Sequence, residues 1–291
     1  MSNLVLQDVK LYYETYAAKD DSANENSSQK KWITLINGHT RSSRDFKLLA
    51  HHLKERGFNV LTFDNRGSSG KTEFFTSNFT FNDMVRDVIA LWDHLGIKKS
   101  AVAGLSMGGF IAQGLVSQQL GRVESLCLIC TSSRLKSKYL SDGVLQGKWG
   151  SDEQGVLKRL EDLYFHPKYC QKNPLILKSM AKKIAEENSL EAGEKNSLFD
   201  ERARLQTEAI KTADEASIKN SLSHLDIPCL IAHGDSDRLL PFKEAEILHD
   251  LIPQSKLHCF KETGHLVLAE RGRELYELIS DLLTKANQKQ L

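Results

Sequence analysis

Short apolar runs alternate with segments of helical period through most of this chain, and the alternation limits the folds open to it. It predicts a mostly parallel, doubly wound β-sheet with helices on both faces, because parallel strands need a helical crossover between them. The N-terminal residues 4–16 alternate apolar and polar side chains, as a half-buried hairpin does. The expected strands cover residues 32–36, 59–64, 101–105, 123–131, 228–233 and 256–260, and the expected helices cover 44–55, 81–95, 107–119, 242–251 and 266–286.

The alternation stops between Ser132 and Leu225, where no clear strand run occurs. We therefore expect an α/β core formed by residues 1–131 and 226–291, and a helical cap formed by the insertion 132–225. Helical candidates within the insertion lie at 152–165, 174–188 and 199–211.

Charge is uneven along the insertion. Residues 134–183 hold 11 basic and 5 acidic side chains, whereas residues 184–215 hold 4 basic and 9 acidic ones. Two interpretations stay open: two solvated helix faces that partly pair, or a basic entrance that attracts an acidic substrate.

Composition excludes several classes of protein. The 39 Lys and Arg residues nearly balance the 38 Asp and Glu residues, and 40% of the chain is apolar, which is typical of a globular protein and not of a basic nucleic-acid binder. No window approaches about 18 consecutive apolar residues, and the N-terminus lacks the pattern of a signal peptide. We expect a cytoplasmic monomer or homodimer that binds neither nucleic acid nor a membrane.

The five cysteines are an odd number in a chain without an export signal, which argues against a disulfide framework. Cys127 and Cys130 have CxxC spacing, but they lie in an apolar strand run, where residues three apart face opposite sides of a sheet. We expect two buried, unreactive thiols rather than a redox or metal site.

The strongest motif is Gly104-Leu-Ser106-Met-Gly108, a G-x-S-x-G sequence between an expected strand and an expected helix. Such a sharp turn holds the serine in a strained conformation, so the positions two before and two after it must be small. The turn also places Ser106 at a helix N-terminus, where backbone amides and the helix dipole favour an oxyanion. This context predicts a nucleophilic serine.

A serine hydroxyl becomes nucleophilic when a histidine oriented by a carboxylate removes its proton. His265 is the predicted base, because Gly264-His265 lies between the strand at 256–260 and the last helix. The other histidines that we weighed fall on helix or loop positions without that context.

The acid should lie in the loop after the strand at 228–233, where Asp235 and Asp237 compete. Asp235 leaves the strand directly and suits a turn-capping role. Asp237 lies further out, four residues before the Pro that opens the next helix, and is the predicted triad acid.

One further motif resembles a phosphate-binding loop. The sequence Asn65-Arg-Gly-Ser-Ser-Gly-Lys-Thr72 differs from G-x-x-x-x-G-K-[ST] at its first position. A phosphate loop also needs a helix that begins at the Lys-Thr pair, and no helical period appears before Phe81. We interpret this segment as a turn.

Four motifs then occur in a fixed order along the chain: Asp64-Asn-Arg-Gly67, Gly104-Leu-Ser-Met-Gly-Gly109, Ile227-Pro-Cys-Leu-Ile-Ala-His-Gly-Asp-Ser-Asp237 and Thr263-Gly-His265. This set resembles the α/β-hydrolase superfamily, in particular carboxylesterase-like members with a helical cap. The resemblance covers residues 4–283, is weakest in the cap, and implies the α/β-hydrolase fold with Asp237 as the acid.

The resemblance also implies an oxyanion hole. The family's His-Gly after the third strand corresponds to Asn37-Gly38, so the histidine is replaced by asparagine. By this match the oxyanion donors are the amides of His39 and Met107.

The implied activity is hydrolysis of a small-molecule ester or acyl substrate through an acyl-enzyme, with no metal or cofactor. Two alternatives stay open: a carbon–carbon bond hydrolase of dienoic keto acids, and a receptor on the same fold that turns over no substrate.

Overall fold

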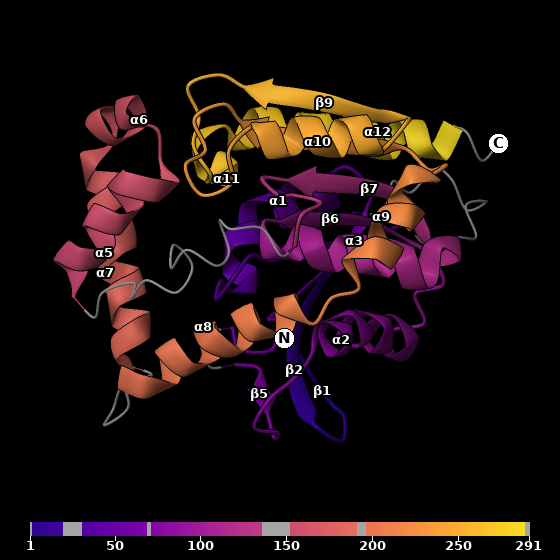
Figure 1. Ribbon diagram of the computed structural model, residues 1–291, viewed down its shortest axis with the longest axis horizontal. Coiled ribbons are helices and arrows are strands. Elements are labelled where there is room, and N and C mark those ends of the chain that lie inside the picture. Colours follow the sequence, from indigo (N-terminus) through magenta and orange to yellow (C-terminus); the bar gives the residue numbers. More distant parts are fainter. Residues whose placement is uncertain (1, 20–30, 69–70, 136–151, 191–195, 289–291) are drawn as a thin grey trace.

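The computed structural model describes residues 2–19, 31–68, 71–135, 152–190 and 196–288. One sheet runs through it in the order β1-β2-β4-β3-β6-β7-β8-β9 (Figure 1). The strands from β4 to β9 on this path pair in parallel, whereas β1, β2 and β5 pair antiparallel, so the predicted mostly parallel sheet is confirmed. The bounds are β1 Ser2–Val5, β2 Val9–Tyr16, β3 Trp32–Ile36, β4 Asn59–Phe63, β5 Glu73–Phe74, β6 Ser100–Leu105, β7 Val123–Ile129, β8 Cys229–Gly234 and β9 Ser255–Phe260.

Helices cover both faces of this sheet, because successive side chains of each strand point to opposite sides. In β6, Val102 belongs to one hydrophobic cluster, while Ala101 and Ala103 belong to the other. The first cluster includes α2 Phe81–His94, α3 Met107–Gln119 and α10 Lys243–Leu251, and the second includes α1 Lys47–Glu55, α11 Val267–Glu270 and α12 Gly272–Gln288.

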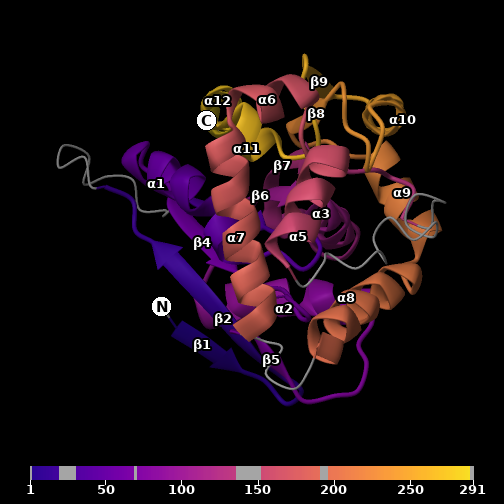
Figure 2. The same cartoon turned by 90° about the vertical axis from the view of Figure 1, so that its left-hand side faces the viewer.

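The inserted segment divides between two hydrophobic clusters. Helices α5 Glu153–Arg159 and α7 Pro174–Leu190 pack around a small cluster of their own, which reaches the sheet domain at Leu239 and Leu266. Helices α8 Asn196–Lys211 and α9 Glu215–Ser223 instead contribute to the cluster of α2 and α3. Figures 1 and 2 show α5, α6 (Pro167–Lys172) and α7 together at one end of the sheet, with α8 running from them toward α2.

Several helix boundaries differ from the expected ones. The expected helix 266–286 is interrupted at Arg271 and forms α11 and α12. The expected helix 152–165 changes into a π-helical turn, Leu160–Tyr164, where the amide of Phe165 bonds the carbonyl of Leu160. Helices α6 and α9 were not expected; α9 begins where the Asp214 side chain caps the amide of Ser217.

Cys127 and Cys130 are free, buried thiols, as expected, and burial raises the pKa of both. They do not face opposite sides, since both belong to the cluster of α1 and α12. Cys130 lies one residue beyond β7 with φ 45°, so the alternation of the strand has already ended.

The strand β5 follows Thr72, so no helix begins at the Lys-Thr pair of the sequence that resembled a phosphate loop. Residues 69–70 of that sequence lie outside the described part of the chain.

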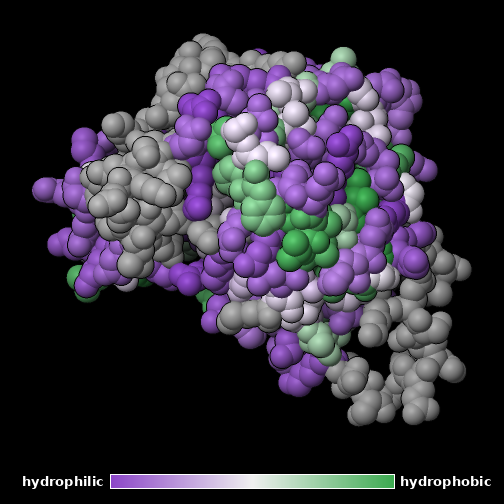
Figure 3. Space-filling view, turned by 90° about the horizontal axis from the view of Figure 1, so that it is seen from below, coloured by the Kyte–Doolittle hydropathy of each residue, from purple (hydrophilic) through white to green (hydrophobic). Residues whose placement is uncertain are grey.

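Across the described residues, no helix combines the length and the apolar character needed to cross a membrane. The face drawn in Figure 3 is mainly hydrophilic and carries one central apolar patch.

Candidate active site

Ser106 occupies the sharp turn between the end of β6 and the start of α3. Its backbone has φ 54° and ψ −117°, a conformation that an L-residue adopts only when its surroundings impose it. The surroundings act on both sides, because the Ser106 amide donates to the Ile129 carbonyl at 2.8 Å and the Thr131 hydroxyl donates to the Ser106 carbonyl at 2.8 Å.

The glycines of the motif are required by contact. A Cβ atom on Gly104 would lie 2.2 Å from the carbonyl oxygen of Gly108, and a Cβ atom on Gly108 would lie 2.0 Å from the carbonyl oxygen of Ile36. Both obstacles are backbone atoms, so neither position can take a side chain unless the turn opens. The expectation of small residues on both sides of Ser106 therefore has a direct geometric cause.

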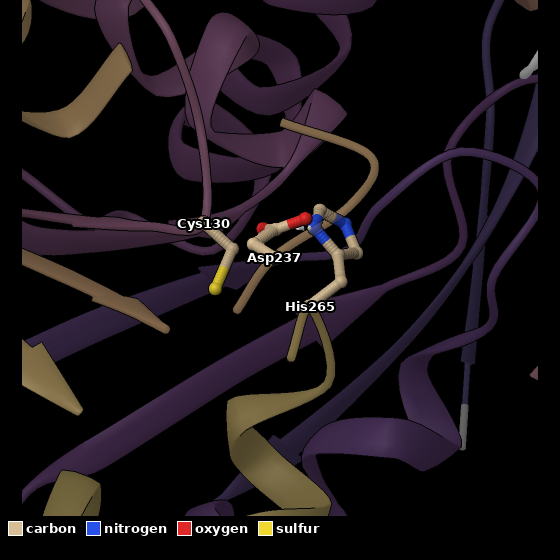
Figure 4. Close-up of side chains that lie close together, drawn as sticks. All are labelled: Cys130, Asp237 and His265. Carbon is tan, nitrogen blue, oxygen red and sulfur yellow. Dashed lines mark hydrogen bonds and ion pairs between the residues drawn. The ribbon is translucent and has the colours of Figure 1, made fainter. Parts of the chain in front are cut away.

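Asp237 and His265 lie on two neighbouring loops, after β8 and after β9. Oδ2 of the carboxylate is 2.7 Å from Nδ1 of the imidazole (Figure 4). The other oxygen, Oδ1, accepts from the amides of Leu239 and Leu240 at 2.9 and 3.0 Å. Burial opposes ionisation of Asp237, but His265 and His233 outweigh it and hold the pKa of Asp237 well below its ordinary value.

Asp235, the competing acid, faces elsewhere. Its carboxylate accepts from the Ser236 hydroxyl at 2.9 Å and from the Thr263 amide at 3.4 Å, which are contacts within the loops themselves. The structure therefore brings Asp237, and not Asp235, to the imidazole of His265.

Cys130 lies beside this pair, and one potential metal-ligand atom from each of Cys130, Asp237 and His265 falls within 4.8 Å of the others (Figure 4). The arrangement suits a metal poorly. The carboxylate and the imidazole are already hydrogen-bonded to each other, and the raised pKa of Cys130 keeps its sulfur protonated, whereas a metal needs a thiolate.

The loop that carries the predicted oxyanion donor His39 passes directly beside the serine. A Cβ atom on Gly38 would lie only 3.4 Å from the Cβ of Ser106. Within the described part of the chain, neither the amide of His39 nor that of Met107 donates a hydrogen bond to another residue. Two uncommitted amides beside the serine are what an oxyanion hole requires.

Asn37, which stands where the resembled family has histidine, is fully buried and closes this loop. Its side-chain amide donates to the carbonyl of Ser42, and its own carbonyl accepts from the Asn65 side chain at 3.0 Å. The asparagine therefore has a structural role in the loop that bears His39.

Ser106 and His265 line one pocket of about 740 Å³, a volume that includes its open mouth. The polar lining includes His39 and the guanidinium-bearing Arg41, and the remaining wall is apolar. The apolar side chains come from both the core and the insertion: Leu105, Met107, Phe110, Leu160, Tyr164, Met180, Ile184, Ile210, Leu239, Leu240 and Leu266.

Two contributors were absent from the sequence prediction. The carbonyl of Tyr164 accepts from the amides of His265 and Leu266, and the side chain of Gln206 accepts from the amide of Thr40, next to His39. Both lie in the insertion, where no motif marks them, and each contacts a residue more than 100 positions away in sequence. Only the tertiary structure could reveal them.

A family model described as "Serine aminopeptidase, S33" matches residues 27–272. The chain belongs to this family of α/β-hydrolases. The predicted superfamily is thereby confirmed.

Solved structures of the same fold cover nearly the whole chain. An enol-lactonase from Burkholderia xenovorans aligns with a TM-score of 0.76 at 20% identity, over 97% of this chain and 100% of that one. A meta-cleavage product hydrolase from Pseudomonas fluorescens reaches 0.79 at 19% identity over 98% of both chains. A thermophilic esterase from Thermogutta terrifontis reaches 0.77 at 21%, over 98% of this chain and 99% of that one. At these identities the likeness shows the fold.

Proposed function

We propose that this α/β-hydrolase cleaves carboxylic esters through an acyl-enzyme on Ser106. The observation that carries the proposal is the meeting of three groups at one place. Ser106 is held in a strained turn, and Ser106 and His265 line one pocket. Asp237 bonds Nδ1 of that histidine. Such a site can cleave esters, lactones and carbon–carbon bonds next to a carbonyl. An uncharged ester needs no charged partner in the wall of the pocket, which is mainly apolar.

The proton relay follows from the hydrogen bonds. An ionised carboxylate only accepts, so Nδ1 of His265 carries the proton that it shares with Asp237, and Nε2 is left as the base. Nε2 would take the Ser106 proton during attack on the carbonyl carbon and return it to the leaving alcohol. Water, activated by the same nitrogen, would then release the acid.

The oxyanion would form between the amides of His39 and Met107. Removal of one such donor typically costs about 100- to 1,000-fold in rate, so the placement of the two amides should contribute substantially to the rate. The acyl chain would lie against the apolar side chains that the π-helical turn, α7 and α8 supply to the pocket.

The test is labelling with a fluorophosphonate, followed by hydrolysis of p-nitrophenyl esters of increasing acyl length. We expect one covalent adduct, on Ser106, and measurable ester turnover. A protein that stays unlabelled would instead be a receptor on this fold, and the proposal would be wrong.

A second candidate is supported by the charge at the pocket. Arg41 and Tyr164 both line it, and the Arg41 guanidinium is also paired with the Asp45 carboxylate through Nε and Nη2, each at 2.7 Å. Arg41 and Tyr164 favour a substrate with its own carboxylate, such as a dienoic keto acid cleaved at a carbon–carbon bond. Turnover of a dienoate with no turnover of neutral esters would favour this candidate over the first.

A further inference from the structure

Helix α8 contacts the loop that carries the predicted oxyanion donor His39. The side chain of Gln206 is fully buried, and its Oε1 accepts from the amide of Thr40 at 2.7 Å. On the same face of the helix, the Ala203 carbonyl and the Thr207 hydroxyl lie 2.9 and 3.1 Å from Nε2 of His39. Residue 39 is therefore tied to α8 through its ring and through the amide that follows it.

The amide group of Gln206 satisfies two partners that need opposite chemistry. Thr40 offers an N–H donor, which Oε1 accepts, whereas the Arg66 carbonyl offers an acceptor, to which Nε2 donates. Nε2 also lies 3.2 Å from the Ser68 hydroxyl. An aliphatic side chain would leave both backbone groups buried without their partner.

The backbone that Gln206 holds is strained. Thr40 has φ 59°, a left-handed conformation that is unfavourable for a β-branched residue and persists only under constraint. Helix α8 also packs closely against the neighbouring turn, since a Cβ atom on Gly67 would lie 3.0 Å from Cγ of Gln206. Without the bond from Gln206, the strained backbone at Thr40 can relax, and the loop that carries the His39 amide can shift with it.

We propose that Gln206 is a positioning residue, which fixes the His39 amide toward the developing oxyanion. The helix of the insertion would then complete half of the oxyanion hole, in addition to walling the pocket. This inference rests on the proposed ester hydrolysis. Its energetic basis is preorganisation: a donor that is already aimed costs no reorganisation in the transition state, whereas a misplacement of about 1 Å costs roughly 100-fold.

The decisive variant is Gln206→Met, which keeps the length of the side chain and removes both hydrogen bonds. We expect kcat per active site to fall about 10- to 100-fold, with KM changed less than about twofold, because the oxyanion exists only in the transition state. A trifluoromethyl ketone, whose adduct carries that oxyanion, should bind more weakly by the same factor as kcat/KM falls.

Two further variants separate positioning from stability. Gln113→Met is the matched control, since Gln113 is also fully buried and donates to the carbonyls of Gly109 and Ser132. It should lower the melting temperature and leave kcat per active site near that of the wild type. Gln206→Glu should retain more of kcat than Gln206→Met, because a buried carboxyl takes up a proton and can then accept from Thr40 and donate to Arg66.

Hydrogen exchange of the 37–42 loop gives a readout that does not depend on turnover. It should become faster in Gln206→Met and stay unchanged in Gln113→Met. The inference is overturned if Gln206→Met retains kcat within about twofold, or if exchange in the loop is unchanged. A wild-type protein that hydrolyses no ester would refute the proposed function instead, while the exchange result would still decide whether Gln206 holds the loop.

Discussion

The amide of His265 donates to the carbonyl of Tyr164 at 2.8 Å, so the inserted helices are bonded directly to the predicted catalytic base. The rings of the same two residues meet edge to face, with their centroids 5.8 Å apart. Glu270 strengthens this junction, since its carboxylate accepts from the amide of Gly264 at 2.7 Å and lies 3.3 Å from the amide of His166. The position of the imidazole therefore depends on the insertion.

Gly264→Ala tests this junction. A Cβ atom at this position would lie 2.5 Å from the Tyr164 carbonyl oxygen and 3.0 Å from the backbone of Phe165, so the two chains must move apart. We expect kcat/KM to fall roughly 10- to 100-fold, as displacement of a catalytic group does. The control is Gly121→Ala, where nothing lies within 4 Å of the added methyl group. Equal activity of the two variants would contradict the prediction.

Ser106→Ala should abolish ester hydrolysis and fluorophosphonate labelling, because it removes the attacking oxygen. Loss of the nucleophile of a triad lowers kcat by a factor on the order of 10⁶. The melting temperature should change little, because the substitution removes only one hydroxyl and the backbone strain at φ 54° is the same for Ala as for Ser. Residual turnover well above background in a preparation free of other esterases would rule out Ser106 as nucleophile.

Asp237→Asn should be far more harmful than Asp235→Asn. Only Asp237 bonds the imidazole, and an amide in its place favours the wrong tautomer of His265, an effect worth roughly 10⁴ in kcat in serine proteases. Because the pKa of Asp237 lies well below its ordinary value, protonation of this carboxylate should not produce the acid limb of kcat/KM in the wild type. If Asp235→Asn were the more damaging change, the acid would be misassigned.

His39 makes stability depend on pH. Burial lowers its pKa from 6.5 to about 4, so between these values the unfolded chain binds a proton that the folded chain does not. Stability is therefore lost as the pH falls from about 6.5 toward 4, by about 3 kcal/mol at most. Urea unfolding from pH 7.5 to 4.5 should give a steeper loss for the wild type than for His39→Gln. Parallel curves would show that His39 is not buried in its neutral form.

Arg41 should govern the response to salt if the pocket prefers anions. In a matched pair of esters, kcat/KM for the anionic one should fall between about 20 and 300 mM salt, while that for the neutral one stays nearly constant. Arg41→Gln should remove the difference. Identical responses in the wild type would favour the other interpretation of the uneven charge, in which the basic side chains of the insertion form a solvated face with no part in the choice of substrate.

The sequence predicted the parts of the site that depend on strand ends. Ser106 directly follows β6, whereas Asp237 and His265 lie three and five residues beyond the ends of β8 and β9. Periodicity therefore located the strands and the loops after them, and residue type supplied the chemistry. Both competing aspartates satisfied these criteria, and only the direction of their side chains separates them. The helix boundaries were less predictable, because the interruption at Arg271 leaves the helical period intact on both sides.

The supporting contacts could not be predicted for a different reason. Tyr164 acts through its carbonyl, a group that every residue has, and Gln206 is one of many polar side chains in a helical segment without a motif. Asn37 was noticed as a departure from the resembled family, yet its bond to Ser42 depends on the shape of the six-residue loop 37–42. Such contacts form because the fold brings these segments together in space, and they leave no pattern in composition or spacing.

The separate hydrophobic cluster of α5 and α7 has a consequence for protein engineering. Because α8 and α9 share the cluster of α2 and α3, a chimera that replaces the whole insertion would remove part of the core. A graft joined between α7 and α8 would exchange the part of the pocket wall formed by Leu160, Tyr164, Met180 and Ile184, and would keep Gln206 with its loop. The grafted residue at position 164 must still offer its carbonyl to the amide of His265. New substrate preferences are therefore best sought by recombination of α5, α6 and α7 alone.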